Sequence, residues 1–288
     1  MSIAYPANTT YSTNLIRFNV TLSETGSCEY SLNSGATNIS MNTFDNITFS
    51  NSSTLSGGAY TIRFYCNDSA GNRNDTELVL FSISNVEIVK SMTGLVSWWR
   101  FEGDAKDSVG SNDGTIYGAI FTSSGKYGGA YQFKNTTADY ITTPLNINDS
   151  KSWSYIFWIN TYDMTGVKQV IDGGNHNPRI FFYQGIFNID YKNYSGVYKG
   201  PIDYTPTTNV WHHFAITWNE STLILYEDGI NVNSSIINDG MLYSVATVRL
   251  GSIFGGASFN GTLDEVMIFN KSLSASEVAD LYNIDLSS

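Results

Sequence analysis

Apolar and polar residues alternate in many short stretches of this chain. In residues 15–22 every second side chain is apolar around Arg17 and Asn19. In residues 211–218, His212, Phe214, Ile216 and Trp218 share one largely apolar face. A period of two is typical of a strand with one buried face. The pattern therefore predicts an all-β protein.

Turn signals divide the first third into short strands. Strand-like runs at 28–32, 47–49, 60–66 and 76–83 are separated by residues such as Gly26 and Gly35. About seven short strands in some 85 residues are typical of a β-sandwich. From Gly94 onward the apolar runs lengthen, and this part holds all six tryptophans. The sequence therefore predicts a second, larger sandwich.

One hairpin and one helix stand out in the second part. Asp228-Gly229 follows the strand at 222–226 and predicts a tight hairpin turn. Ser274-Ala-Ser-Glu277 forms a capping box before apolar residues at 278–282. We expect this C-terminal helix to pack on the sandwich as a closing element.

The length of 288 residues fits about two domains. A candidate boundary lies at residues 89–94, after the last strand of the first third. We therefore expect domains at 1–90 and 91–288. The boundary has no long Gly/Ser tract, so a short, semi-rigid connection is expected.

The charge balance excludes two classes of partner. Lys and Arg number 15 and Asp and Glu 26, which gives a net charge of −11. Nucleic acids and anionic membranes would be repelled. No apolar run approaches the roughly 18 residues of a membrane helix, and no basic and then apolar leader follows Met1. We expect a soluble fragment whose secreted parent would need a leader or anchor.

Two features indicate an oxidising, extracellular compartment. Cys28 and Cys66 each lie in a strand-like run, which favours a disulfide over a free buried pair. Such a bond would stabilise the fold by roughly 4 kcal/mol. The chain also has 14 Asn-x-Ser/Thr sequons, which indicate either N-glycosylation or merely Asn- and Thr-rich turns. They begin at Asn8, Asn19, Asn38, Asn46, Asn51, Asn67, Asn74, Asn135, Asn148, Asn193, Asn219, Asn233, Asn260 and Asn270.

An ordered set of motifs carries a family resemblance. The motifs lie at 99–102 (WRFE), 107–115, 125–133, 211–215 (WHHFA), 225–229 and 259–270. On these, residues 95–283 resemble a laminin-G-like, concanavalin A-type jelly roll, a scaffold that carries lectins, adhesins and hydrolases alike. The first third resembles immunoglobulin-like modules of archaeal-type surface proteins, through residues 28–33 and 66–72. That resemblance implies a stalk.

Four acids form a candidate calcium site in the second domain. Glu102, Asp107, Asp113 and Asp264 lie in or beside Gly-rich turns. The jelly-roll resemblance implies that the early and late segments lie close together, and that a structural calcium ion is a candidate cofactor. The alternative is that these carboxylates cap turns and bind nearby backbone amides.

Catalytic residues are not expected. Glu102, Asp104 and Asp107 form E-x-D-x-x-D, close to a motif of retaining glucanases. The last residue differs, however, and Gly103 interrupts the strand. His212 and His213 are adjacent, so they would point to opposite faces of a strand and are interpreted as structural.

The candidate ligand-binding residues mix amides, charges and tyrosines. This chemistry suits sugars, whose rings stack on aromatic side chains while planar polar groups bind their hydroxyls; the alternative is ordinary loop and strand surface. The candidates are Asp172, Asn175, His176, Arg179, Tyr191, Tyr194 and Tyr198.

These observations predict an extracellular cell-surface protein for adhesion or recognition. Its expected partners are glycans or surface glycoproteins. An alternative is a structural subunit of a surface layer or filament that binds copies of itself. An exposed stretch at residues 3–11, able to add as a strand to a neighbour, would favour that alternative. A glycoside hydrolase ranks third.

Overall fold

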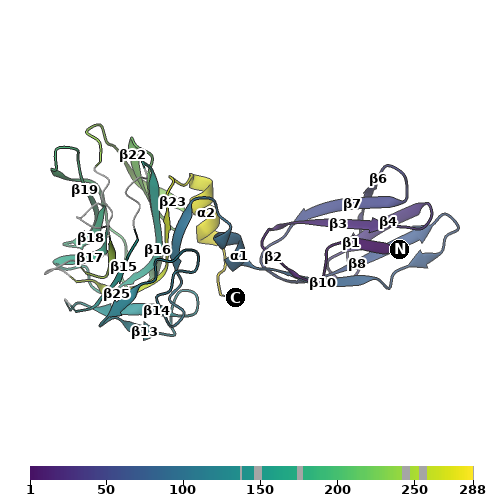
Figure 1. Cartoon of the computed structure of the whole chain (residues 1–288), viewed down its shortest axis with the longest axis horizontal. Helices are drawn as coiled ribbons and strands as arrows, with labels where there is room; N and C mark the ends of the chain where they lie inside the picture. Colours follow the sequence, from purple (N-terminus) through teal and green to yellow (C-terminus); the bar gives the residue numbers. More distant parts are fainter. Residues whose placement is uncertain (137, 146–150, 174–177, 242–246, 253–257, 288) are drawn as a thin grey trace. The chain divides into compact units, whose positions relative to one another are not determined.

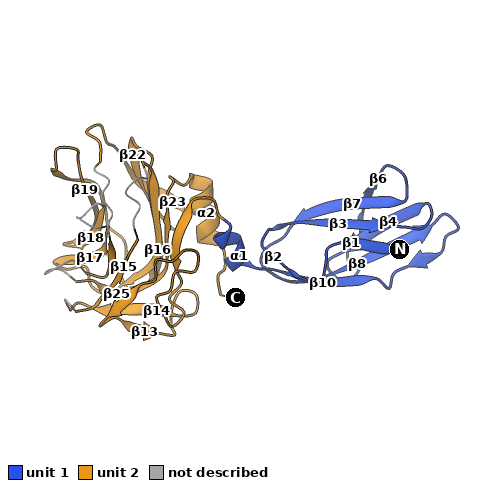
Figure 2. Cartoon of the chain, viewed as in Figure 1, with its two compact units in different colours: residues 1–91, 288 blue, residues 92–287 orange. Residues whose placement is uncertain are grey.

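The computed structural model describes residues 1–136, 138–145, 151–173, 178–241, 247–252 and 258–287. The chain divides into two compact units, residues 1–91 and 92–287 (Figure 2). The described residues are mostly strand, with one helix in each unit. The all-β fold class predicted from the alternation is confirmed.

Unit 1 is a sandwich of two sheets (Figure 1). One sheet has the order β1-β3-β7-β6. The other has the order β2-β10-β8-β4-β5, with β9 paired to β8. The strands are β1 (Ser2–Tyr5), β2 (Thr10–Tyr11), β3 (Leu15–Thr21), β4 (Gly26–Ser31), β5 (Ile39–Ser40), β6 (Asn42–Thr43), β7 (Thr48–Thr54), β8 (Gly58–Asp68), β9 (Arg73–Asn74) and β10 (Leu78–Ile83).

The core of unit 1 contains the expected disulfide. Cys28 of β4 lies directly opposite Cys66 of β8, and the two are bonded. Both are buried with Phe18 and Phe64 in one apolar cluster. The bond joins neighbouring strands of the same sheet, whereas the disulfide of antibody domains joins two sheets. The predicted disulfide is confirmed.

The N-terminal stretch pairs within its own unit. Strand β1 lies antiparallel to β3, and β2 lies parallel to β10. Residues 2–5 and 10–11 therefore already belong to the two sheets. Both lie at the edges of their sheets, so assembly through residues 3–11 stays a prediction.

A helix absent from the expectations ends unit 1. Helix α1 (Asn85–Lys90) begins after Ser84, whose side chain accepts a hydrogen bond from the Glu87 backbone N–H. Ser-x-x-Glu is the same signature that predicted the C-terminal helix. The sequence therefore held the signal at residues 84–87, inside a segment interpreted as strand and linker. Neither helix of the described chain is long and apolar enough to cross a membrane.

Unit 2 is a larger sandwich of an eight-stranded and a seven-stranded sheet. The first has the order β13-β14-β25-β16-β21-β22-β23, with β11 also paired to β25. The second has the order β12-β15-β24-β17-β18-β19-β20. The strands are β11 (Leu95–Trp99), β12 (Thr115–Tyr117), β13 (Ile120–Thr122), β14 (Ala130–Lys134), β15 (Tyr140–Thr143), β16 (Trp153–Thr161), β17 (Val167–Asp172), β18 (Arg179–Tyr183), β19 (Ile186–Lys192), β20 (Tyr198–Tyr204), β21 (Trp211–Trp218), β22 (Thr222–Glu227), β23 (Ile230–Ile236), β24 (Val248–Leu250) and β25 (Asn260–Phe269).

The core of unit 2 lies between these sheets. Phe214, Ile216 and Trp218 face it from β21, as the alternation predicted, and Phe214 stacks on Phe187 of the opposite sheet at 4.5 Å. The hairpin turn after β22 is confirmed as well. Asp228 and Gly229 both have positive φ, of 51° and 81°, as a type I′ turn requires.

Helix α2 (Ala275–Asn283) covers the outer face of the eight-stranded sheet. Its capping box forms as predicted, with Ser274 and Glu277 bonded reciprocally. Tyr282 packs on Trp158 and on His213, with ring centroids 5.8 Å apart in each pair. The C-terminal helix is confirmed as a closing element. It does not cover the outer face of the seven-stranded sheet.

Candidate ligand-binding face

Four charged residues of alternating sign cross the outer face of the seven-stranded sheet. Arg249 of β24 lies opposite Asp172 of β17, Asp172 opposite Arg179 of β18, and Arg179 opposite Asp190 of β19. Residues directly opposite on neighbouring strands point to the same face. Their neighbours Ile171, Ile180 and Ile189 point into the core. We call the four residues the charged row.

Arg179 connects the charged row to an exposed tyrosine. Its guanidinium forms an ion pair with Asp190, and it lies 4.3 Å from the Phe181 ring and 5.7 Å from the Tyr198 ring. Lys192 also lies over Tyr198, at 4.8 Å. The Tyr198 side chain is 44% exposed. An exposed ring beside a planar, hydrogen-bonding guanidinium is suited to bind a sugar.

A glycine allows this arrangement. A Cβ at Gly200 of β20 would lie 2.6 Å from Asp190 Oδ1, too close for an ordinary contact. A larger residue at this position would therefore push on the carboxylate that pairs with Arg179.

The structure brings together three of the seven candidate ligand residues. Asp172, Arg179 and Tyr198 share the outer face. Tyr191 instead joins the core, and its hydroxyl donates to Asp239 Oδ1 at 2.9 Å. Burial raises the pKa of the Tyr191 hydroxyl. Its position in β19, one residue after Asp190, explains the error, because adjacent strand residues face opposite ways.

The other three candidates do not add to this group. Tyr194 is exposed in the turn between β19 and β20, where its ring lies against Gly240. Asn175 and His176 lie outside the described residues.

A second aromatic group on the same face was missed from the sequence. Tyr117 of β12 stacks on Tyr140 of β15 at 4.6 Å, and the Arg249 guanidinium lies 3.9 Å from the Tyr140 ring. Tyr117 is 44% exposed. The alternation of residues 115–117 and 140–142 indicated this group, since the next cross-strand pair, Ile116 with Ile141, faces the core and leaves the tyrosines on the outer face.

Two of the candidate calcium ligands are turn caps. Asp107 Oδ1 accepts the backbone N–H groups of Trp98 and Val109, and Oδ2 accepts that of Asn112. Burial acts to raise the pKa of Asp107, but backbone hydrogen bonds, first among them that of Gly110, lower it overall. Asp113 Oδ1 accepts the N–H of Asp107 itself. This is the turn-capping alternative stated above.

The other two candidate ligands hold one loop. Asp264 Oδ2 accepts the backbone N–H groups of Lys126 and Tyr127, at 2.9 and 3.0 Å. Glu102 Oε2 accepts the N–H of Gly129 at 3.0 Å. The predicted proximity of the early and late segments is therefore present, and backbone amides occupy these carboxylates.

Glu265, which was not singled out from the sequence, is buried beside Asp264. Strand β25 bulges here, Glu265 has a positive φ of 49°, and its Oε2 accepts the Trp98 indole N–H at 2.5 Å. Arg100 Nε lies 3.6 Å from Glu265 Oε1. Burial raises the pKa of Asp264 to about 7 and that of Glu265 to about 9.

No group of three or more His, Cys, Asp or Glu side chains is arranged to hold a metal ion in the described part of the chain. Calcium binding through Glu102, Asp107, Asp113 and Asp264 stays a prediction. Melting of the protein before and after chelation would test it.

The acids of the glucanase-like motif lie in the loop after β11. Glu102 binds the 125–129 loop, Asp107 caps its own turn, and Asp104 is exposed and pairs with Lys106. His212 and His213 point to opposite faces of the sheet, as expected. His213 is buried under α2, while His212 Nδ1 lies 3.0 Å from Glu227 Oε1.

The sequon asparagines differ in how accessible they are. Asn193 is 7% exposed, and its amide nitrogen donates to Asp239 Oδ2 at 2.8 Å. The amide nitrogens of Asn51 and Asn233 donate to backbone carbonyls. Asn148 lies outside the described residues. We expect Asn193 to be the poorest acceptor of a glycan among the described sequons.

One family model matches the chain. It describes the concanavalin A-like lectin/glucanases superfamily, in its laminin G-like form, and it matches residues 135–279, which is 145 of the 288 residues. A comparison of the sequence with curated proteins gives no significant match.

Solved binding domains share the fold at low identity. The binding domain of Paraclostridial Mosquitocidal Protein 1 matches with a TM-score of 0.58 and 20% identity, over 66% of this chain and 52% of its own. The receptor-binding domain of botulinum neurotoxin type G matches with 0.56 and 16%, over 66% and 51%. The chain thus matches about half the length of these toxin domains.

A third structure is matched over nearly its whole length. It is domain 4 of AbnA, an extracellular GH43 arabinanase from Geobacillus stearothermophilus, in complex with arabinotriose. It has a TM-score of 0.54 and 20% identity, over 66% of this chain and 98% of its own. At such identities these likenesses establish the fold alone.

Proposed function

The chain belongs to the concanavalin A-like lectin/glucanase superfamily, and we propose on that basis that unit 2 binds glycans through the outer face of its seven-stranded sheet. The protein is proposed to serve adhesion or recognition at the cell surface. A fold of this kind fixes no ligand by itself. The proposal therefore depends on the side chains of the face.

The arrangement of Arg179 and Tyr198 supports the proposal most directly. The guanidinium is held by Asp190 and lies 5.7 Å from a ring that remains 44% exposed. Ordering these side chains before binding lowers the entropic cost of association. The toxin domains that share the fold are binding domains by their descriptions, and the arabinanase domain is in complex with arabinotriose.

Unit 1 is proposed to be the stalk that carries unit 2. Its two-sheet sandwich supports an immunoglobulin-like module of the kind found in archaeal-type surface proteins. Disulfides form and persist in oxidising compartments. The Cys28–Cys66 bond therefore supports an extracellular location.

A glycan array with the whole protein tests the proposal. We expect binding to a restricted set of oligosaccharides, with the affinity falling at least tenfold in Tyr198→Ala. Tyr183→Ala is the matched control, because Tyr183 is 52% exposed on the same face but lies four residues from Arg179, roughly 13 Å along β18.

Three results would contradict the proposal. One is an array without binding by the parent. Another is binding that Tyr198→Ala leaves unchanged. The third is release of reducing ends from a bound glycan that stops in Glu102→Gln, since this would indicate a hydrolase.

A further inference from the structure

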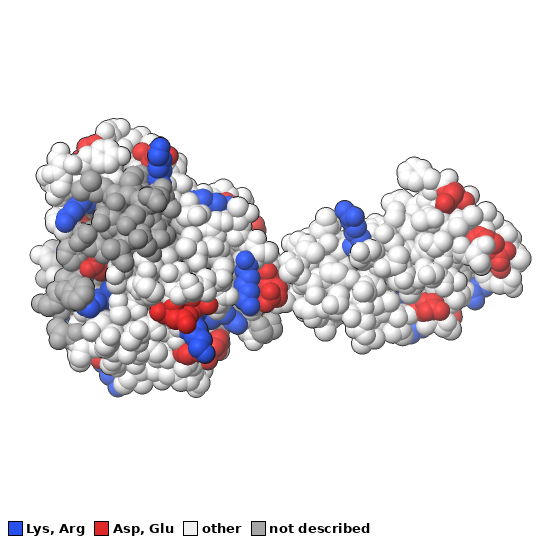
Figure 3. Space-filling view, viewed as in Figure 1, with Lys and Arg blue, Asp and Glu red and all other residues white. Residues whose placement is uncertain are grey.

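One lysine of unit 2 is buried. On the face drawn in Figure 3, Lys and Arg side chains project from the surface, as charged groups usually do. Lys168 of β17 differs, because it is only 6% exposed, and no other lysine of the described residues is buried. It lies directly opposite Phe182 of β18, which belongs to the core. The stem of Lys168 therefore points into the sandwich from the seven-stranded sheet.

The ammonium group of Lys168 meets two side chains. Its Nζ donates to Asn135 Oδ1 at 2.9 Å and lies 3.1 Å from Asp163 Oδ2. Asn135 directly follows β14 of the eight-stranded sheet, and Asp163 lies in the loop between β16 and β17. One amine thus links the two sheets through an amide and also contacts a carboxylate.

The amide and the carboxylate are both held in place. The backbone N–H of Asn135 donates to the Phe259 carbonyl at 2.8 Å, and Asp163 Oδ1 accepts the backbone N–H of Thr165 at 2.8 Å. A carbonyl bond is about 1.2 Å long, so Lys168 Nζ lies within about 4 Å of Asn135 Cγ, the electrophilic carbon of the amide. Groups that are already oriented in this way need little further ordering to react.

We propose that Lys168 and Asn135 join in an intramolecular isopeptide bond, with Asp163 as the proton carrier. Asp163 takes one proton from the Lys168 ammonium, and the free electron pair of Nζ attacks Asn135 Cγ. The Cγ–Nζ bond forms and the Cγ–Nδ2 bond breaks, while a second Nζ proton moves to Nδ2, which leaves as ammonia. Ammonia then takes the proton from Asp163 and departs as ammonium, so the carboxylate is restored. No oxidant, reductant or other reactant is needed.

The surroundings of the three groups suit this reaction. Asn135 is exposed, so the released ammonium can pass into solvent. The backbone N–H of Thr165 lowers the pKa of Asp163 to about 2. The carboxylate is therefore ionised and able to accept a proton, but it is a weak base. We expect the bond to form slowly, which is sufficient for a step that each molecule performs once.

The bond gives unit 2 a covalent link of its own. Unit 2 has no cysteine, whereas unit 1 has the Cys28–Cys66 disulfide. A link between β17 and the end of β14 restricts the unfolded chain and thereby stabilises the folded one. Unlike a disulfide, it withstands reducing agents. This inference is independent of the proposed glycan site.

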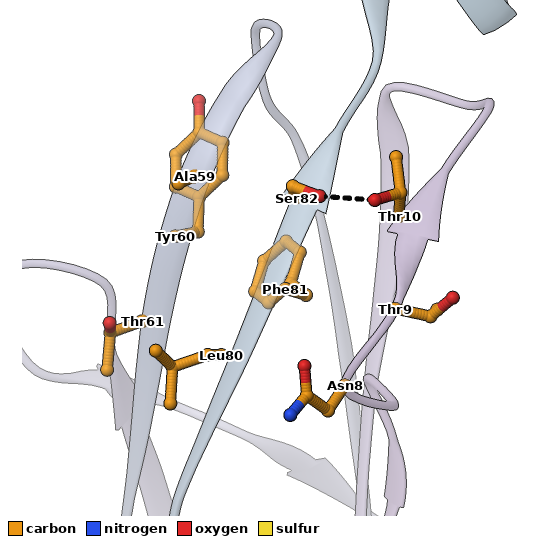
Figure 4. A pocket seen from close by; sticks show the side chains of 9 residues that line it. All are labelled: Asn8, Thr9, Thr10, Ala59, Tyr60, Thr61, Leu80, Phe81 and Ser82. Carbon is orange, nitrogen blue, oxygen red and sulfur yellow. Dashed lines mark hydrogen bonds between the residues drawn. The ribbon is translucent and has the colours of Figure 1, made fainter.

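Unit 1, which is described throughout, offers no second site of this kind. Lys90 is its only lysine, and its Nζ lies 2.9 Å from a carboxylate oxygen of Glu87. The pocket beside β10 contains the Asn8 amide but no amine or carboxylate that could react with it (Figure 4). The chemistry therefore belongs to unit 2.

Intact-mass measurement of the whole, reduced protein tests the proposal. The protein is made without N-glycosylation, because Asn135 begins a sequon. After prolonged incubation, the parent should weigh less than its sequence by one ammonia molecule. Lys168→Arg keeps a positive charge beside Asp163 but should retain the full mass. Lys106→Arg is the matched control, since Lys106 also pairs with an aspartate but on the surface, and it should show the same deficit as the parent.

Peptide mapping locates the bond. Trypsin does not cleave after a lysine whose amine is acylated, so residues 135–151 should be recovered joined to residues 152–179. Lys168→Arg should release these segments as separate peptides. Asp163→Asn should yield the joined peptides much more slowly than the parent, because it lacks the proton carrier.

Three outcomes overturn the proposal. One is a parent that keeps its full mass after prolonged incubation. Another is a deficit that persists in Lys168→Arg. The third is a deficit that maps outside the joined peptides, since a succinimide formed at another asparagine also releases ammonia. An Asp163→Asn variant that forms the bond as fast as the parent would overturn the role given to Asp163.

Discussion

The two outer faces of the unit 2 sandwich are built by the same strand alternation, but one is covered by other parts of the chain and the other carries exposed side chains. On the eight-stranded sheet, Trp158 and His213 lie under Tyr282 of α2, and the carboxylates of Asp264 and Glu265 are buried. On the seven-stranded sheet, Tyr198 stays 44% exposed near Arg179, while Asp172, Asp190 and Arg249 of the charged row are largely buried. Strand alternation places side chains on both outer faces. Segments packed over a face, such as α2, determine whether those side chains remain accessible to a ligand.

The largest expected effect is on stability, where loss of a covered tryptophan is compared with loss of an exposed tyrosine. Trp158 is 3% exposed and touches Tyr127, His213 and Tyr282. Trp158→Ala should lower the free energy of unfolding by about 3–5 kcal/mol, which corresponds to about 10 °C in the melting temperature of a unit of this size. Tyr198→Ala should change it by less than about 0.5 kcal/mol. Thermal melting followed by circular dichroism measures both, and equal losses would show that the two faces do not differ.

The second prediction concerns pH, which should act mainly on the covered face. Burial raises the pKa of Asp264 to about 7 and that of Glu265 to about 9, against values near 4 in an unfolded chain. Between these limits the folded state binds more protons than the unfolded state, so stability falls as pH rises. The contribution is complete below pH about 4 and is lost as the pH rises through about 7 and then about 9.

His213 works in the opposite direction at acid pH. Burial lowers its pKa to about 3, so it favours folding as the pH rises toward 6.5. The acid pair is therefore seen best between pH 7 and 9. Arg100, Glu102 and Tyr127 face the pair and remain in every variant. The parent's melting temperature should fall across this interval, and the Asp264→Asn/Glu265→Gln double variant should be nearly flat. A double variant that falls as steeply as the parent would contradict the assignment.

The third and smallest effect concerns glycan affinity at the outer face of the seven-stranded sheet. Arg179→Lys keeps the positive charge next to Asp190 but loses the planar, forked donor set of the guanidinium. We expect glycan affinity to fall roughly five- to tenfold, about 1–1.4 kcal/mol, with an unchanged melting temperature. Calorimetric titration with the tightest glycan from the array checks this. Unaltered affinity would place the ligand elsewhere.

Local patterns in the sequence were enough to predict much of the fold. Alternation located strands such as β3 and β21, the Cys28 and Cys66 contexts gave the disulfide, and Ser274 with Glu277 gave α2. Each of these depends on residues close in sequence or on one chemical pairing. The same reasoning overlooked α1, although Ser84 and Glu87 carry the identical capping signature.

The candidate site was harder to predict, because strand pairing builds it. Asp172 and Asp190 are brought beside Arg179 by two separate strand registers, and Tyr117 meets Tyr140 through a third. Tyr191 was chosen as a ligand candidate by its residue type, whereas its strand position directs it into the core. Two of the four acids expected to bind calcium, Glu102 and Asp264, instead accept hydrogen bonds from backbone amides that only the folded 125–129 loop supplies.

Hydrogen–deuterium exchange of the whole protein, with and without the tightest glycan from the array, tests the central claim most directly. We predict slower exchange in residues 179–204, which form β18 to β20, and no change in β11, β16 or α2 on the covered face. The same protection should disappear in Tyr198→Ala. Protection confined to unit 1 or to the α2 face would contradict the account.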